Sequence, residues 1–515
     1  MISSIGIRNF KAFGDVLQQA PMSKITLIYG PNSGGKSSII QALLLLKQSA
    51  IQAGHAATIW GLVTRGEYVD LGSYAALLHN HDLRAQLELS LKYEYGGTQL
   101  STELKFGGVS DYDESGNEYL HDSGVLTQAR YRVARGGQSI VSATLINAGG
   151  SWWNTRTSVG NFSRSHKILD FRFGDQFLPE LKLLELEQLI EKNDQTLTDR
   201  ERGLLLERAR IREMEMRRQR VRYERLTNMT PEELAQLPEL DRDLNAAEDD
   251  MLALNREPDS EFIAALDRVL QSDELLALKQ IPESFKNRLN SIRYLGPLRS
   301  HPERLYKVPG VESYWSGLKG EFTHHRLYYQ PGLKHLVNDW FQRFQIPYVL
   351  EVQRVGDMAV SGEHIALVLV SNASQTRVAI PDVGFGINQL LPVIVEGVDF
   401  FTGGEGRILC VEQPEIHLHP KLQANLADLM IANITGDGEK QWIVETHSEL
   451  LALRMQRRIR EGILCNSDVS VLYVQPDRKG ELGSEIKSLR IDDRGDFIDP
   501  WPDGFFEEGF DEIVA

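Results

Sequence analysis

A glycine-rich stretch near the start of the chain, from Gly30 to Ser37, constrains the fold more than any other feature. It reads Gly-Pro-Asn-Ser-Gly-Gly-Lys-Ser and fits the pattern G-x-x-x-x-G-K-[ST]. The run before it, 24–29, is β-rich, and residues 38–47 have the composition of a helix. A strand, a glycine-rich turn and a helix start present backbone N–H groups to a polyphosphate. The stretch therefore predicts a nucleotide site in which Lys36 reaches the β- and γ-phosphates and Ser37 binds Mg²⁺.

Composition narrows the class of protein. A chain of 515 residues is too long for one simple core, so two or three structural units are expected. The net charge of −16 works against indiscriminate binding to nucleic acid or anionic membrane, although it allows a local basic patch. Two cysteines, Cys410 and Cys465, are too few for a disulfide framework or a four-ligand zinc site. Without a signal pattern at residues 1–7 or a long apolar run, we expect a cytoplasmic protein that has no membrane partner.

The chain divides into four expected segments. Residues 1–178 contain the phosphate loop and then glycine-punctuated strands, which predict one half of an α/β domain with an antiparallel β layer. Residues 179–260 predict a helical coiled-coil insertion. Residues 261–460 return to alternating strands and helices, and 461–515 are expected to form a small C-terminal domain. Strands that end in polar residues and lead into helices place the chemistry at the carboxyl edge of one sheet.

The predicted insertion has an unusual composition. Glycine nearly disappears after residue 179, while Leu, Glu and Arg dominate. A capping box at Thr198-x-x-Glu201 favours helix, but Arg218 interrupts the apolar stripe that a regular heptad would need. Two interpretations of the arginines stay open. They indicate either a solvated helix with intrahelical ion pairs or a surface for nucleic acid or a partner protein.

Three motifs in the second half accompany the phosphate loop. A glycine-rich turn at 383–389 opens a helix, whose N-terminus is a potential anion site. The apolar strand 407–412 ends in Glu412, and Gln413 follows it. Another strand, 441–445, leads into Thr446-His447-Ser448.

Together these motifs resemble the ABC-type ATPases of the RecF, SMC and OLD group, which are AAA-type proteins with split nucleotide-binding halves. Residues 8–11 are similar to the opening strand and turn of that group, 383–389 to its signature motif, 408–413 to Walker B, and His447 to its switch histidine. The resemblance implies an α/β, ABC-type P-loop head with a mixed sheet, which binds ATP and Mg²⁺. It also implies that two heads sandwich two nucleotides, so that each signature turn faces the phosphate loop of the partner copy.

The resemblance extends to residues 412–420 and 501–508, which are similar to a bacterial subfamily with a short C-terminal domain of unknown function. Relatives in anti-phage defence, such as the PtuA subunit of Septu, work with a nuclease. The expected partners are therefore a second copy of the chain, a nuclease or other effector, and possible nucleic acid. The expected catalytic residues are Glu412, Gln413, Glu415 and His447, and the Mg²⁺ ligands Ser37 and, through water, Glu412. The expected nucleotide-binding residues are Asn32, Ser33, Gly34, Gly35, Lys36, Ser37, Ser38, Gly384, Gly386 and Asn388.

One residue departs from the pattern of the group. Many ABC-type heads have a glutamate directly after the Walker B acid, but this chain has Gln413, an amide that cannot accept a proton as a carboxylate does. Either Glu415 or His447 helps to place the attacking water while Glu412 supports Mg²⁺, or hydrolysis is slow and the ATP-bound dimer persists. We favour weak but real hydrolysis, because positioning and charge stabilisation carry much of phosphoryl transfer.

Other functional classes are less well supported. His417 and His419 are two residues apart, which is not the helical spacing of a zinc site, so we interpret them as part of a structural turn. Asp492, Asp493 and Asp496 lack the pattern of a Toprim nuclease, and we expect a turn there as well. A nucleotide-holding scaffold and a RecF-like DNA repair ATPase remain the alternatives, while a transporter ATPase fits the split halves and the insertion less well.

Overall fold

The computed structural model describes most of the chain outside the predicted insertion. The described residues are 1–52, 61–112, 118–136, 138–147, 153–159, 162–164, 169–172, 180–183, 273–308, 315–356, 362–399, 407–435, 440–477 and 482–506. They form two compact units, the first made of residues 1–127 and 283–515 and the second of residues 128–282. Strands from the C-terminal part of the chain complete a sheet of the first unit.

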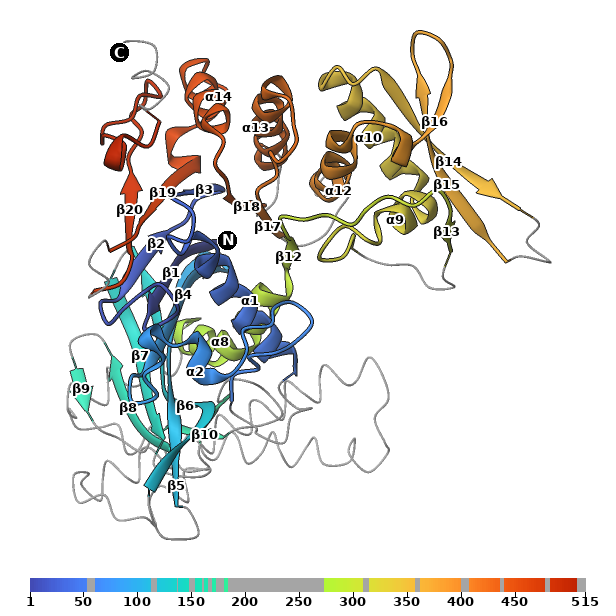
Figure 1. The fold of residues 1–515 in the computed structure, drawn as a ribbon. Helices are drawn as coiled ribbons and strands as arrows, with labels where there is room; N and C mark the ends of the chain where they lie inside the picture. Colours follow the sequence, from blue (N-terminus) through green and yellow to red (C-terminus); the bar gives the residue numbers. More distant parts are fainter. Residues whose placement is uncertain are drawn as a thin grey trace, which may run out of the picture. The chain divides into compact units, whose positions relative to one another are not determined.

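A six-stranded sheet is the centre of the first unit (Figure 1). Its order is β12 (Ile292–Leu295), β17 (Ile408–Glu412), β18 (Gln441–Glu445), β3 (Ile25–Tyr29), β19 (Val469–Gln475) and β20 (Glu485–Leu489). Neighbouring strands are parallel except β19 and β20, which are antiparallel. Every residue of β3, β17 and β18 is buried, as their continuous apolar runs predict for parallel strands covered on both faces.

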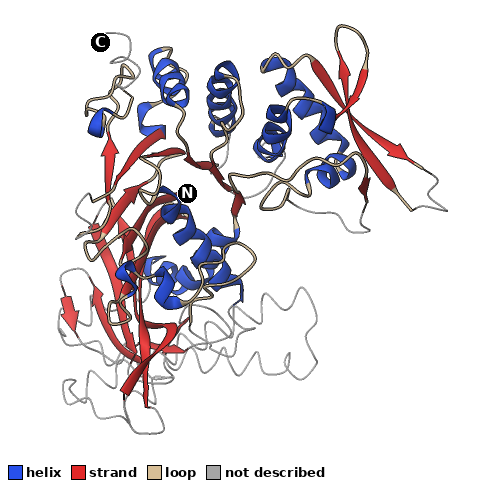
Figure 2. Ribbon diagram, viewed as in Figure 1, coloured by secondary structure: helices blue, strands red, loops and turns tan. Residues whose placement is uncertain are grey.

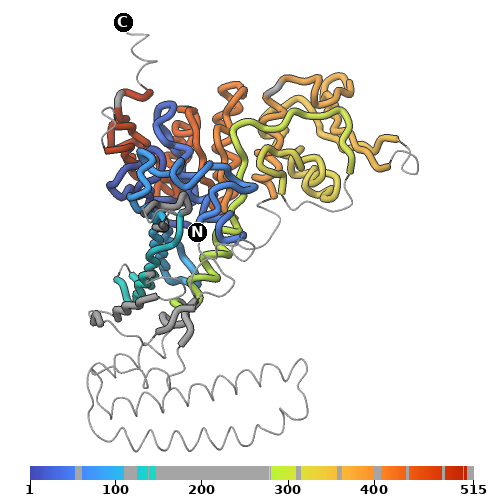
Figure 3. Tube along the Cα trace, turned by 60° about the horizontal axis from the view of Figure 1, so that its bottom comes forward, coloured from blue at the N-terminus to red at the C-terminus, as the bar shows by residue number. Residues whose placement is uncertain are grey.

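Helices cover both faces of this sheet (Figure 2). The helix α1 (Lys36–Gln52) lies on one face, while α13 (Pro420–Ile434) and α14 (Glu449–Arg460) lie on the other. One large hydrophobic core joins alternate residues of the strands to α12 (Phe385–Asp399), α13 and α14. The tube in Figure 3 shows the blue N-terminal and the orange to red C-terminal segments side by side, as the pairing of β3 with β18 and β19 requires.

Two further sheets complete the first unit. The antiparallel layer has the order β2 (Gln18–Pro21), β1 (Ile2–Arg8), β4 (Leu87–Tyr95) and β5 (Thr98–Tyr112), followed by β6 (Glu118–Arg135), which runs on into the second unit. The other sheet pairs β13 (Tyr306–Lys307) and β14 (Tyr348–Val355) with β15 (His364–Ser371), which also pairs with β16 (Arg377–Ala379). The remaining helices are α2 (Tyr74–Leu77), α8 (Asp273–Asn290), which reaches into the second unit, α9 (Thr323–Tyr329) and α10 (Pro331–Arg343).

The second unit is described in its strands and in the first part of α8. From residue 128 onward β6 pairs with β7 (Gln138–Asn147), and β8 (Trp153–Val159) and β9 (Phe162–Arg164) follow in antiparallel order. A separate pair joins β10 (Leu169–Arg172) to β11 (Glu180–Leu183). The expectation of helix from residue 179 is therefore wrong at 180–183, where the alternation Glu-Leu-Lys-Leu fits a strand. The rest of the predicted coiled-coil insertion lies outside the described residues.

The structure confirms the expected α/β class, the mixed sheet and the antiparallel β layer. Asp492 and Asp496 form a turn, as expected, in which the Asp492 N–H donates to the carbonyl oxygen of Asp496 at 2.9 Å. None of the described helices is long and apolar enough to cross a membrane.

Candidate functional site

The loop from Gly30 to Ser37 connects β3 to α1 and requires glycine at two positions. Gly30 has φ +143° and Gly35 has φ +102°, in the region that disfavours side chains. A Cβ at Gly30 would lie 2.4 Å from the carbonyl oxygen of Val474, and one at Gly35 would lie 2.6 Å from Ala12 Cβ. Since α1 begins at Lys36, the positive end of its dipole lies at the loop, as a phosphate site needs.

Lys36 folds back over this loop. Its ammonium donates to the carbonyl oxygen of Pro31 at 2.8 Å, and the residue is only 5% exposed. Burial lowers the pKa of Lys36, while the nearby Glu445 and Glu415 oppose that change. An ammonium group held in this way against the backbone of the loop is suited to binding an anionic ligand.

Two carboxylates lie beside the loop, at the ends of neighbouring strands. Glu412 ends β17 and Glu445 ends β18, and the two residues are paired in register. The Ser37 hydroxyl donates to Glu445 Oε2 at 2.7 Å, and the Tyr294 hydroxyl donates to Glu412 Oε1 at 2.9 Å. Burial, and then the charge of Glu445, raise the pKa of Glu412 to about 7, while burial also raises the pKa of Glu445. A pair of buried carboxylates next to a phosphate loop is suited to binding a cation.

The donor set of this site fits Mg²⁺. Mg²⁺ prefers hard oxygen ligands and keeps several waters, and it is bound through one or two carboxylates together with substrate phosphates. The Ser37 hydroxyl and the carboxylates of Glu412 and Glu445 are such ligands. No group of three or more His, Cys, Asp or Glu side chains that could hold a metal ion is found in the described residues.

Gln413 follows β17 directly and has a left-handed backbone, at φ +46°. Its N–H donates to the Glu445 carbonyl oxygen at 2.7 Å, and its own carbonyl oxygen accepts from Arg299 Nη1 at 3.1 Å. Arg299 Nη2 also donates to the carbonyl oxygen of Glu412 at 3.0 Å. Burial lowers the pKa of Arg299 to about 10. The guanidinium of Arg299 therefore holds the backbone of Glu412 and Gln413 in place.

Glu415 and His447 lie next to each other across this turn. Glu415 Oε1 accepts a hydrogen bond from the His447 N–H at 2.7 Å, and burial raises the pKa of this carboxyl. His447 Nε2 is buried and has no hydrogen-bond partner among the described residues. Burial, and then the charge of Lys36, lower the pKa of His447, so its ring is neutral at pH 7. A neutral ring nitrogen without a partner near Lys36 is available to a ligand at this site.

The glycine-rich turn lies near Arg299, whose backbone N–H donates to Gln389 Oε1 at 3.4 Å. Asn388 Nδ2 donates to the carbonyl oxygen of Ser300 at 3.2 Å, and a Cβ at Gly386 would lie 2.9 Å from the carbonyl oxygen of His417. A Cβ at Gly384 would have no atom within 4 Å. None of the hydrogen bonds between described residues joins this turn to the phosphate loop of the same chain.

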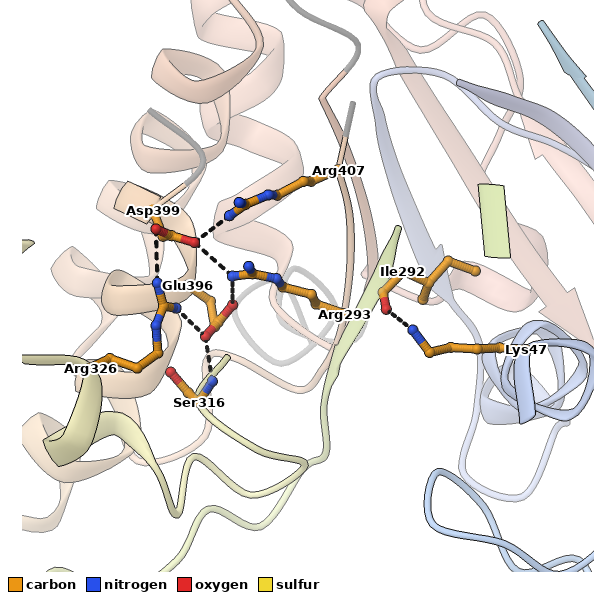
Figure 4. A network of polar contacts seen from close by, with 8 residues as sticks. All are labelled: Lys47, Ile292, Arg293, Ser316, Arg326, Glu396, Asp399 and Arg407. Carbon is orange, nitrogen blue, oxygen red and sulfur yellow. Dashed lines mark hydrogen bonds and ion pairs between the residues drawn. The ribbon is translucent and has the colours of Figure 1, made fainter. Parts of the chain in front are cut away.

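Buried ion pairs hold the helix that follows this turn (Figure 4). Glu396 of α12 accepts from Arg326 Nη1 at 2.7 Å and from Arg293 Nη1 at 2.8 Å. Asp399 of the same helix pairs with Arg326 Nη2 at 2.8 Å and with Arg407. The backbone N–H of residue 316 donates to Glu396 as well, at 2.7 Å. The network therefore fixes α12 to β12 and α9.

Several functional candidates could not be found by motif alone. Glu445 could have been recognised in the sequence, because it ends an apolar strand in the same way as Glu412. Tyr294 lies in β12 and Arg299 follows this short strand, which carried no motif, and their contacts became visible only in the fold. Lys11, which donates to Gln41 Oε1 at 2.6 Å, has its pKa lowered by burial while Glu412 opposes that change.

The two histidines that follow β17, His417 and His419, form a turn and a helix cap. His419 is the N-cap of α13, and its Nδ1 accepts from the Lys421 N–H at 3.3 Å. His417 has φ +62° and forms the turn that abuts Gly386. Both observations fit the interpretation of this stretch as a structural turn.

Comparison with known proteins adds a family. The family described as "AAA ATPase domain" matches residues 1–250 and 310–452, and one described as "Protein of unknown function (DUF3696)" matches residues 464–515. No curated protein matches.

Solved structures similar to this chain include heads of Smc proteins. One from Pyrococcus furiosus, bound to the C-terminal domain of ScpA, is 14% identical with a TM-score of 0.37, covering 95% of this chain and 96% of that one. One from Thermotoga maritima is 9% identical with a TM-score of 0.35, covering 95% and 99%.

Proposed function

Because the chain belongs to the family of AAA ATPase domains, we propose that it binds ATP with Mg²⁺, hydrolyses it slowly, and dimerises in the ATP-bound state to regulate a partner protein. The observation that carries the proposal is the placement of Ser37 and Lys36 against the carboxylates at the ends of β17 and β18. In this arrangement the ammonium of Lys36 and the carboxylates of Glu412 and Glu445 lie at the same loop.

The residues have separate roles in this proposal. Backbone N–H groups of the loop and the ammonium of Lys36 hold the phosphates, with Asn32, Ser33, Gly34, Gly35 and Ser38 forming the rest of the cradle. Bound Mg²⁺ would neutralise the charge that develops on the phosphates. Ser37 and Glu412 support that ion, and His447 contacts the γ-phosphate through its unpartnered Nε2.

Replacing Lys36 with alanine tests the nucleotide site. We expect ATP binding to fall by at least about 100-fold, because an ammonium that contacts phosphate contributes a charge-assisted interaction of a few kcal/mol. Lys319→Ala is the matched control, since the side chain of Lys319 is exposed. Isothermal titration with ATP and Mg²⁺ measures both variants. An unchanged affinity of Lys36→Ala would rule out this phosphate site.

Water activation is the weak point of hydrolysis here, since Gln413 cannot act as a base. Glu415 is the carboxylate that lies next to His447 and is the candidate to place the water. Introducing Gln413→Glu should raise the rate of phosphate release if the protein hydrolyses ATP. Rates near zero for both proteins would favour the alternative function, a scaffold that holds nucleotide with little turnover.

The glycine-rich turn supports dimerisation. Gly384 is exposed, and a side chain there would meet no atom of its own chain within 4 Å. In a head-to-head dimer Gly384, Gly386 and Asn388 would face the phosphate loop of the second copy. Gly384→Glu should therefore leave ATP binding intact while it repels the partner's phosphates. Light scattering with a non-hydrolysable ATP analogue should show a dimer of the wild type and a monomer of the variant; a dimer of both would contradict this assembly.

The partner is proposed to be a nuclease or another effector of anti-phage defence or DNA surveillance. A state that forms only with ATP and is lost slowly would give such an effector a defined trigger. Affinity purification with and without ATP, with Gly384→Glu as the control that cannot dimerise, identifies a partner that requires the dimer.

A further inference from the structure

The proposal above uses Glu445 only as one of two carboxylates beside the phosphate loop and does not say what its contact with Ser37 does. It is 4% exposed and lies at the end of β18. Ser37, the first residue after Lys36, donates its hydroxyl hydrogen to Glu445 Oε2 at 2.7 Å. Among the described residues, no other side-chain or backbone donor forms a hydrogen bond with this carboxylate.

We propose that Glu445 is a positioning residue that prepares the Ser37 hydroxyl for Mg²⁺. A hydroxyl has one hydrogen and two lone pairs. Because the hydrogen of Ser37 is directed at Glu445, its lone pairs point elsewhere and are available to a cation. Partners that orient a metal ligand in this way raise its basicity and fix its geometry. This inference rests on the proposed function, because it assigns a role within the same nucleotide site.

A purely structural role explains the contact less well. The backbone of Glu445 already holds β18 in place, since its register with β17 and β3 is fixed by ladder hydrogen bonds and its carbonyl oxygen accepts from the Gln413 N–H. The side chains of Glu445 and Glu412 are both buried and stand in register on neighbouring strands. Two buried carboxylates side by side are favoured when cations lie next to them, and Mg²⁺ would add such a charge to that of Lys36.

Replacing Glu445 with glutamine separates the two roles. Gln keeps the size of the side chain and an oxygen that accepts from Ser37, but it removes the charge. We expect the Mg²⁺ concentration for half-maximal ATP binding to rise by about 10- to 100-fold, the range for partners that orient a metal ligand. ATP binding in EDTA should stay the same or become tighter, because one negative charge near the phosphates is lost.

Fluorescence anisotropy with a labelled ATP, in EDTA and over a Mg²⁺ titration, measures both quantities. Glu449→Gln, an exposed site four residues along, is the matched control. Ser37→Ala and the double variant Ser37→Ala/Glu445→Gln complete a cycle. If Glu445 acts through Ser37, the double variant should need no more Mg²⁺ than Ser37→Ala alone.

The outcomes distinguish this inference from the proposed function. If Glu445→Gln has the Mg²⁺ requirement of the wild type, or loses affinity equally with and without Mg²⁺, the inference is wrong while the nucleotide site stands. If the wild-type protein binds no ATP with Mg²⁺, the proposed function fails and the inference falls with it. A raised Mg²⁺ requirement with intact metal-free binding supports both.

Discussion

Replacing Arg326 with methionine should strongly destabilise the first unit. Arg326 is 1% exposed, and its guanidinium pairs with Glu396 and Asp399 at 2.7 and 2.8 Å. Removing one partner of a buried ion pair typically costs about 3–5 kcal/mol, because the opposite charge stays buried. Two features favour the lower end. Arg293 and Arg407 still neutralise the carboxylates, and Arg326 Nε is buried without a partner, so its loss relieves one cost.

Urea unfolding followed by tryptophan fluorescence measures the effect, because Trp340 and Trp442 belong to the core that contains α12. We expect a loss of about 3 kcal/mol in the free energy of unfolding. The control is Arg377→Met, which removes an ion pair with Glu351 that is 2.6 Å long but half exposed, and which should cost at most about 1 kcal/mol. Equal losses for the two variants would refute the idea that burial makes this network important.

The pH dependence gives the same prediction a second readout. Burial opposes the ionisation of Glu396, but Arg326 and Arg293 outweigh it and hold the pKa of Glu396 below its ordinary value. A depressed carboxyl pKa contributes stability that is present above the ordinary value and lost as the pH falls through the folded value. The difference in the free energy of unfolding between the wild type and Arg326→Met should therefore become smaller from pH 7 toward pH 4. A constant gap over this range would show that Glu396 is not the affected group.

Two further predictions concern the neighbourhood of α12. Gly386→Ala should lower the free energy of unfolding by about 1–3 kcal/mol, because its Cβ would lie 2.9 Å from the carbonyl oxygen of His417. The control Gly384→Ala should be close to neutral, because a Cβ there meets no atom within 4 Å. Equal effects of the two substitutions in thermal denaturation would contradict this prediction. Burial lowers the pKa of His324 to about 3, so the stability it contributes is present above the ordinary value of 6.5 and is lost below it. From pH 7 to pH 5 this loss should be about 2 kcal/mol, and His324→Phe, which keeps the stacking on Tyr306, should remove that part of the pH dependence.

The sequence was sufficient for the phosphate loop and the strand ends, because local patterns specify them. Gly30 and Gly35 have the backbone angles that the motif predicts, and Glu412 ends a buried strand as its apolar run predicts. The contact between Ser37 and Glu445 could not be predicted, because it joins residues 408 positions apart through strand order alone. The strand at 180–183 was missed because the composition of the whole segment outweighed a short local alternation.

The same long separation has a consequence for the synthesis of the protein. The phosphate loop leaves the ribosome long before β18 and β19, which flank β3, are made. At about 5–20 residues per second, the 408 residues between Ser37 and Glu445 take roughly 20–80 s to add. Until then β3 has neither of its sheet neighbours, and Ser37 lacks the carboxylate that accepts its hydrogen bond. A nascent chain that has not reached Glu445 therefore carries the glycine-rich loop without this contact.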